Sequence, residues 1–274
     1  MKPIKKTLAL AALAGLLAVP ATRTLFAADG QKAADAPKTA EPPAVEIPVD
    51  PNANKLTDEE KAAGWKLLFD GKDTEGWHSY KKDKAGSGWA VKDGILTCEK
   101  PGREAGDLCT NDKYTWFELS LEYNISHAGN SGILFHVTDA GGATWSTGPE
   151  FQLEDNTAAA DPIRCGWLYA LYQPPIDPKT NKTLDATKPV GEWNKVRLLV
   201  SKDKCEHDIN GVKYFEYVLN SEDFNSRVEK SKFNHKKPGM ANYAKFDTGY
   251  LVLQGDHGKV SFRNVKVRPI EEGK

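Results

Sequence analysis

The chain of 274 residues carries little excess charge and only four cysteines. Its formal net charge is −1, so no broad electrostatic field favours nucleic acid or an anionic membrane as a partner. Cys98, Cys109, Cys165 and Cys205 match no zinc-binding spacing, and we interpret them as structural or free. In an exported chain disulfides are the alternative, and Cys98 and Cys109 flank a turn-rich segment across which they could pair.

Long apolar runs are also scarce. The run at residues 8–21 is shorter than the roughly 20 residues that a membrane-spanning helix needs. Lysines precede it and small residues follow it at 25–28, which together are typical of a signal peptide. We therefore predict a signal peptide over residues 1–28, a periplasmic or secreted protein, and no membrane insertion after cleavage. An uncleaved anchor is the alternative.

The segment after this run has almost no aromatic residues. Residues 29–55 are rich in Ala, Pro, Asp and Lys, and such a composition cannot bury enough surface to offset its ordering entropy. We expect a disordered linker there, followed by one domain over residues 56–274. No internal repeat and no second linker divide that domain.

The remaining pattern is that of short strands. Residues 117–125 alternate strictly between apolar and polar side chains, and residues 132–137 follow as an expected antiparallel neighbour. Asn210-Gly211 predicts a tight hairpin, and Thr57 with Glu60 predicts a short capped helix. The fold class predicted is all-β, a two-sheet sandwich.

The most informative strand lies at residues 150–154. At a strand period Glu150, Gln152 and Glu154 share one face, while Phe151 and Leu153 share the other. Carboxylates on a half-buried strand are costly unless they meet a cation, a proton or a polyhydroxyl ligand. We expect the three polar side chains to line an open surface, with Glu150 opening into the main cleft and the long aperiodic interval from 155 to 191 walling that cleft.

The order of several motifs resembles the 3-keto-disaccharide hydrolase family. The motifs are WKLLFDGKD at 65–73, WAVKDGIL at 89–96, FELSLEY at 117–123, GNSGI at 129–133, EFQLED at 150–155, GEWN at 191–194, LQGDHG at 253–258 and FRNV at 262–265. The resemblance implies a concanavalin A-like jelly roll and an enzyme, a hydrolase or lyase, that cleaves 3-keto-glycosides. It also implies a carbohydrate partner, a 3-keto-disaccharide or 3-keto-glycoside.

The implied reaction is abstraction of the C2 proton, elimination of the glycosidic oxygen and hydration. It needs a base, a proton donor and a stabiliser for the enediolate, which a divalent metal cation of unknown identity could supply. Glu150 and His257 are the catalytic candidates or metal ligands, and Gln152 is a candidate for orienting substrate hydroxyls. Further candidate substrate contacts are Asp107, Asn130 and Tyr169, although Asp107 and Asn130 also suit ordinary turns. His136, which alternates with Phe135 and Val137, is expected to share the face of Glu150 and is a weaker ligand candidate.

Two other functions stay open at this stage. The Glu150, Gln152, Glu154 trio resembles the catalytic strand of retaining glucanases, whose two carboxylates lie roughly 5–5.5 Å apart. Residues four apart on a regular strand are about 13 Å apart unless a bulge shortens the path. A non-catalytic sugar-binding module would equally use the seven tryptophans.

Overall fold

Apolar side chains at every second position build β6 (Phe117–Ile125), the strand that the alternation predicted. The computed structural model describes residues 50–255 and 257–271, and in it β6 lies inside an eight-stranded antiparallel sheet. The order is β13-β12-β11-β6-β15-β4-β3, with β1 also paired to β15. These strands are β1 (Lys66–Leu67), β3 (Trp89–Lys92), β4 (Ile95–Cys98), β11 (Asn194–Val200), β12 (Cys205–Ile209), β13 (Val212–Tyr217) and β15 (Val260–Pro269).

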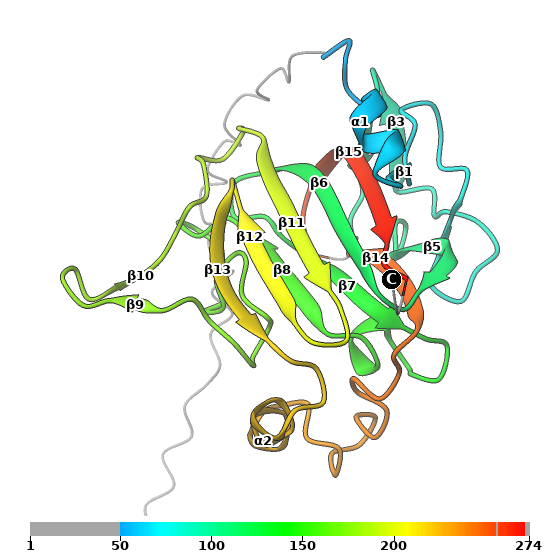
Figure 1. Cartoon of the computed structure of the whole chain (residues 1–274). Helices are drawn as coiled ribbons and strands as arrows, with labels where there is room; N and C mark the ends of the chain where they lie inside the picture. Colours follow the sequence, from blue (N-terminus) through cyan, green and yellow to red (C-terminus); the bar gives the residue numbers. More distant parts are fainter. Residues whose placement is uncertain (1–49, 256, 272–274) are drawn as a thin grey trace, which may run out of the picture. The chain divides into compact units, whose positions relative to one another are not determined.

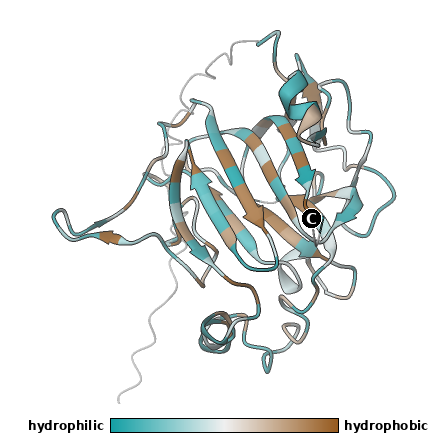
Figure 2. Ribbon diagram, viewed as in Figure 1, coloured by the Kyte–Doolittle hydropathy of each residue, from teal (hydrophilic) through white to brown (hydrophobic). Residues whose placement is uncertain are grey.

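A second, five-stranded antiparallel sheet packs behind the first (Figure 1). Its order is β2-β5-β14-β7-β8, with β2 (Trp77–Ser79), β5 (Leu108–Tyr114), β14 (Gly249–Leu253), β7 (Asn130–Val137) and β8 (Glu150–Glu154). The expected all-β two-sheet jelly roll is thereby confirmed. Brown and teal alternate along several strands, as expected when only one face enters the core (Figure 2).

The expected pairing of β6 with β7 is wrong. β6 pairs with β11 and β15, whereas β7 pairs with β14 and β8 in the other sheet. The two strands instead face each other across the core, where the rings of Phe117 and Phe135 lie 6.3 Å apart edge to face.

Segments outside the sheets include two helices, a 3₁₀ turn and a small hairpin. They are α1 (Asp58–Ala62), α2 (Glu222–Lys230), η1 (Thr144–Ser146), and β9 (Ile176–Asp177) paired with β10 (Lys182–Thr183). The predicted capping box of Thr57 and Glu60 is present. Within the described ranges no helix combines the length and apolar character needed to cross a bilayer.

The described domain begins earlier than the sequence indicated. Asn54, placed in the linker above, is buried and exchanges hydrogen bonds with the Asn264 side chain and backbone at 2.6 and 2.8 Å. The predicted signal peptide, and the linker up to residue 49, lie outside the described residues.

All four cysteines are buried, and none of them forms a disulfide in the described part of the chain. The pairing of Cys98 with Cys109 is wrong, because β4 carries Cys98 in the larger sheet and β5 carries Cys109 in the smaller one. Burial raises the pKa of the Cys165 and Cys205 thiols to about 12, so both stay protonated at neutral pH.

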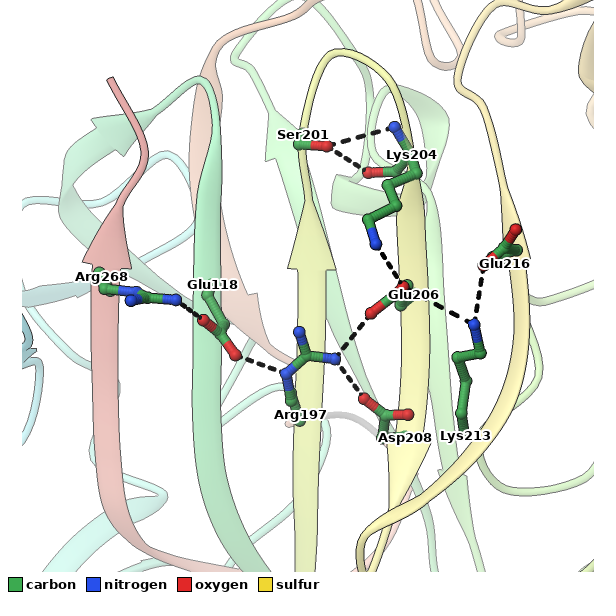
Figure 3. Close-up of polar contacts among 9 residues, drawn as sticks. All are labelled: Glu118, Arg197, Ser201, Lys204, Glu206, Asp208, Lys213, Glu216 and Arg268. Carbon is green, nitrogen blue, oxygen red and sulfur yellow. Dashed lines mark hydrogen bonds and ion pairs between the residues drawn. The ribbon is translucent and has the colours of Figure 1, made fainter. Parts of the chain in front are cut away.

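The outer face of the larger sheet carries an extended ion-pair network (Figure 3). Arg197 on β11 binds Glu118 on β6 and both Glu206 and Asp208 on β12. Burial alone would lower the pKa of Arg197, but its hydrogen bonds to Asp208, Glu206 and Glu118 outweigh that cost and raise it. Arg268, Lys204 and Lys213 extend the network on both sides. Because these carboxylates are already neutralised by cations, the carboxyl groups of the smaller sheet are the better candidates for a reactive site.

Candidate active site on the smaller sheet

β8 presents its polar residues on the face that points away from the core, as the strand period predicted. Phe151 and Leu153 enter the hydrophobic core, and Glu150, Gln152 and Glu154 alternate with them. The expectation of an open surface is wrong, because all three polar residues are buried. Residues 166–169 of the long loop pair with β8 along its edge, Arg164 binds Glu154, and Lys232 and Tyr243 of the later segment 231–246 lie near Glu150.

A transverse row of residues crosses this sheet from edge to edge. The backbone pairs Gly132 with Gln152, joins Gln254 to Gly132 through a 2.9 Å hydrogen bond, and joins Tyr80 to Asp107 through one of 2.8 Å. The adjacent pairing of Leu253 with Leu108 aligns Gln254 with Asp107. The row therefore reads Tyr80, Asp107, Gln254, Gly132, Gln152, with Gly132 as its one position without a side chain.

The carboxyl group of Glu150 lies over Gly132. A Cβ atom at Gly132 would come within 2.8 Å of Glu150 Cγ and 2.9 Å of its Cδ, closer than real contacts allow. Only glycine leaves room for this carboxyl group above the sheet. The sequence placed Glu150 on the correct face, but the need for glycine beneath its carboxyl group becomes visible only in the structure.

Three buried polar atoms near Glu150 point to a polar ligand. The Oε1 atoms of Gln152 and Gln254 and the hydroxyl of Tyr243 have no hydrogen-bond partner among the described residues. The three side chains are at most 4% exposed. Burial, and next the nearby Glu150 carboxylate, raise the pKa of Tyr243 well above its ordinary value. Because unpaired buried polar groups are costly, such a group of atoms is typical of a binding site.

Glu154, at the far end of β8, has a raised pKa that suits a proton donor. Its side chain is fully buried, and burial raises its pKa to about 7 against the opposing effects of Arg164 and Gln152. Arg164 lies 3.3 Å from one carboxyl oxygen, and the Gln152 amide donates to the other at 3.4 Å. A carboxyl group that keeps its proton up to about pH 7 is suited to general acid catalysis.

Tyr169 and Lys232 close the Glu150 end of the strand. The Tyr169 amide donates to the Glu150 carbonyl at 2.9 Å, and the Tyr169 hydroxyl donates to Asp161 at 2.6 Å. The Lys232 ammonium lies 3.9 Å from the Tyr169 ring centre. Burial lowers the pKa of Lys232, while the Glu150 and Asp161 carboxylates oppose that shift.

Asp107 lies in a cleft of about 700 Å³ at the other end of the transverse row. Its carboxylate accepts hydrogen bonds from the Thr144 hydroxyl and, at 3.2 Å, from the Gly255 amide. We expected Glu150 to open into the main cleft and residues 155–191 to wall it. Instead, within the described structure, residues 79–86, 103–107 and 142–145 supply the lining of this cleft.

The register places Asn130 opposite Glu154, and His257 precedes a glycine that lies beside Asn130. Asn130 pairs with Glu154, and a Cβ atom at Gly258 would lie 3.0 Å from the Asn130 amide nitrogen. His257 is exposed. A shared site for Glu150 and His257 stays a prediction. His136, in contrast, is buried and bonds the Thr115 carbonyl at 2.7 Å, so its assignment to the Glu150 face is wrong.

Sequence reasoning missed several residues of this site. They are Gln254, Arg164, Lys232, Tyr243 and Trp145, with Glu154 recognised on the strand but not as a titrating group. Gln254 lies in the LQGDHG motif at 253–258. Its position two strands from Gln152, across β14, β7 and β8, follows only from the strand pairing. In the described part of the chain, no three His, Cys, Asp or Glu residues converge as metal ligands.

The glucanase interpretation needs a bulge in β8. The five residues of β8 pair with β7 in continuous register, from Glu150 opposite Leu134 to Glu154 opposite Asn130. The α-carbons of Glu150 and Glu154 are thus about 13 Å apart, and β8 has no bulge that would shorten this path.

Known proteins resemble this chain over most of its length. A 3-keto-disaccharide hydrolase of Bacteroides thetaiotaomicron is 30% identical over 264 residues, which cover 85% of this chain and 84% of the relative. A solved structure from Parabacteroides distasonis, named as a glycosyl hydrolase, matches with a TM-score of 0.71 and 32% identity, covering 80% of this chain and all of that one. A second from the same organism matches with a TM-score of 0.55 and 25% identity, covering 75% of this chain and 99% of the other.

The matched segment includes both sheets and every residue of the site described above. Residues 64–268 match the domain described as 3-keto-alpha-glucoside-1,2-lyase-like. The chain belongs to this 3-keto-alpha-glucoside-1,2-lyase-like family.

Proposed function

We propose that this protein is a glycoside-cleaving enzyme that acts on 3-keto-glycosides. The family and the relative named 3-keto-disaccharide hydrolase support a carbohydrate substrate. The observation that carries the proposal is the Glu150 carboxyl group above Gly132, between two buried amide oxygens, of Gln152 and Gln254, that have no partner among the described residues. Those acceptors suit sugar hydroxyls, and the carboxylate suits a base.

The proposed chemistry begins at C2 of the oxidised sugar. The C3 carbonyl acidifies the hydrogen at C2, and Glu150 removes it to give an enediolate. The enediolate expels the glycosidic oxygen from C1, and water then adds to complete a net hydrolysis. Lys232 approaches from residues 231–246 on the Glu150 side and would place positive charge near the enediolate oxygen.

The leaving oxygen needs a proton. We assign this role to the Glu154 end of β8, where Glu154 keeps its proton up to about pH 7 and where His257 directly precedes Gly258, the glycine beside Asn130. An imidazole transfers protons in either direction near neutrality. The α-carbons of Glu150 and Glu154 lie about 13 Å apart along the strand, and we assign the two carboxyl groups to different atoms of one substrate.

A divalent cation fits the same oxygen atoms. Carboxylate and amide oxygens are the ligands that hard divalent cations prefer, and Glu150, Gln152 and Gln254 would hold such an ion. When bound, it would supply positive charge to the enediolate oxygen. Turnover that is lost on chelation and restored by Mg²⁺ or Mn²⁺ would establish this role. Turnover that resists chelation would show that the amide oxygens bind the sugar hydroxyls instead of a metal ion.

Turnover of 3-keto-trehalose, beside plain trehalose, tests the proposed function. Glu150→Gln and His257→Ala should each lower turnover by about 10²-fold or more, the usual worth of general acid–base help. Glu216→Gln, an exposed glutamate on the larger sheet, is the matched control and should keep wild-type turnover. Full turnover in both site variants would show that the assignment is wrong, and cleavage of trehalose alone would refute the keto-sugar substrate.

We also propose that the enzyme is exported, because the start of the chain has the pattern of a signal peptide. Cell fractionation followed by mass determination of the mature N-terminus tests this. Recovery of the full-length chain in the cytoplasm would contradict it.

A further inference from the structure

The cleft beside Asp107 contains Trp145, the one tryptophan in the described part of the chain whose side chain is exposed. Trp145 is 43% exposed, although its neighbours in η1, Thr144 and Ser146, are buried. Backbone bonds from Ser146 to Ala143 and from Gly148 to Thr144, at 3.1 and 3.0 Å, close this turn. The indole is therefore presented to solvent by a turn that is itself held in place.

Asp107 connects this turn to the transverse row. One carboxylate oxygen accepts from the Thr144 hydroxyl and the other from the Gly255 amide, which follows Gln254 directly. The Tyr80 hydroxyl holds the neighbouring wall of the cleft in place by donating to the carbonyls of Thr138 and Gly141 at 2.9 and 3.1 Å. The aromatic wall of the cleft is thus tied to the sheet that carries Glu150.

The charges that line the cleft balance. Three cations, Lys82, Lys84 and Arg103, face three anions, Asp83, Glu104 and Asp107. Such a lining offers many hydrogen-bond donors and acceptors without a net field for an anionic or cationic ligand. An exposed indole face among balanced polar groups suits a neutral polyhydroxyl ring, whose C–H face stacks while its hydroxyls bind the rim.

The spacing suits the second ring of a two-ring substrate. Asp107 and Gly132 lie two strands apart on the row, which is about 10 Å at the usual strand separation. If the oxidised ring lies over Gly132, as the proposed function requires, the ring joined to it reaches toward the cleft. The row leads directly from one position to the other through Gln254.

We propose that the cleft lined by Tyr80, Asp107, Thr144 and Trp145 is a second sugar subsite, which takes the neutral pyranose ring of the leaving group and stacks it on Trp145. The inference rests on the proposed function for the place of the first ring. The binding of the second ring is a separate property, and it makes the enzyme prefer disaccharides to glycosides with a small leaving group.

The test compares two substrates, 3-keto-trehalose and methyl 3-keto-glucoside. Trp145→Ala should lower kcat/KM for the disaccharide about tenfold more than for the methyl glycoside, a difference worth about 1.4 kcal/mol. The loss should come from a higher KM, with kcat nearly unchanged. Trp145→Phe should recover most of that loss. Trp193→Ala, which removes a tryptophan stacked on Arg263, is the matched control and should leave the substrate ratio unchanged.

Calorimetric titration with plain trehalose separates the subsite from the chemistry. Binding that the wild type shows and Trp145→Ala loses supports the subsite even if no keto-sugar is cleaved, in which case only the proposed function fails. Equal losses on both substrates, or trehalose affinity that Trp145→Ala leaves intact, would overturn the subsite.

Discussion

Glu154→Gln should change stability in a way that depends on pH. In the folded protein burial raises the pKa of Glu154 to about 7, whereas its ordinary value is 4.5. A carboxyl group with a raised folded pKa stabilises the fold fully below pH 4.5, and that stability is lost as pH rises to about 7. Glutamine resembles the protonated acid and cannot ionise, so the variant is spared this loss.

The size of the effect follows from the shift. A rise from 4.5 to about 7 corresponds to about 3 kcal/mol at pH 8, an upper estimate because Arg164 can follow the ionised carboxylate. At pH 4.5 the wild type and Glu154→Gln should unfold with nearly equal free energies. At pH 8 the variant should be the more stable, by an amount between about 1 and 3 kcal/mol.

Urea unfolding at half-unit steps from pH 4.5 to 8.5 measures this difference. Glu216→Gln, which removes an exposed carboxylate from the other sheet, controls for the loss of one negative charge. A wild-type-minus-variant difference that stays constant across the range would show that Glu154 ionises normally. The assignment of Glu154 as a proton donor would then also be wrong.

Two further predictions concern Gly132 and Glu206. Gly132→Ala forces the Glu150 carboxyl group to move, so turnover should fall by about 10²-fold while the melting temperature changes by only a few degrees, and unchanged turnover would contradict the placement of Glu150. The hydrogen bond from Lys204 helps lower the pKa of Glu206 to about 2, so the stability from this contact is present above pH 4.5 and lost as pH falls toward 2. Lys204→Met should therefore destabilise the fold by about 0.5–1 kcal/mol at pH 5 and less at pH 3 in urea unfolding, and an equal effect at both values would count against it.

Local pattern predicted the elements well because their causes are local. Alternation in residues 117–125 specified β6, and the Thr57 and Glu60 pair specified the cap of α1. Alternation reports which face of a strand is apolar but not which strand lies beside it. For this reason β7 was assigned to the wrong neighbour, although its strand character was recognised.

The site was predictable only in part, since distant segments complete it. The period of β8 placed Glu150, Gln152 and Glu154 on one face, yet they are buried, and their neighbours Arg164, Lys232 and Tyr243 come from segments without a strand period. The raised pKa of Glu154 follows from that burial, so no local pattern contains it. His136 departs for another reason: its φ of 53° breaks the alternation and takes the ring away from the Glu150 face.

Incorporation of solvent deuterium at C2 tests the central claim most directly. Cleavage of 3-keto-trehalose in D₂O, followed by mass spectrometry of the released sugar against an enzyme-free control, should show one deuterium at C2 with the wild type and with Glu216→Gln. Glu150→Gln should lose both the exchange and the cleavage. Cleavage by the wild type without deuterium at C2 would contradict proton abstraction by Glu150 and the mechanism built on it.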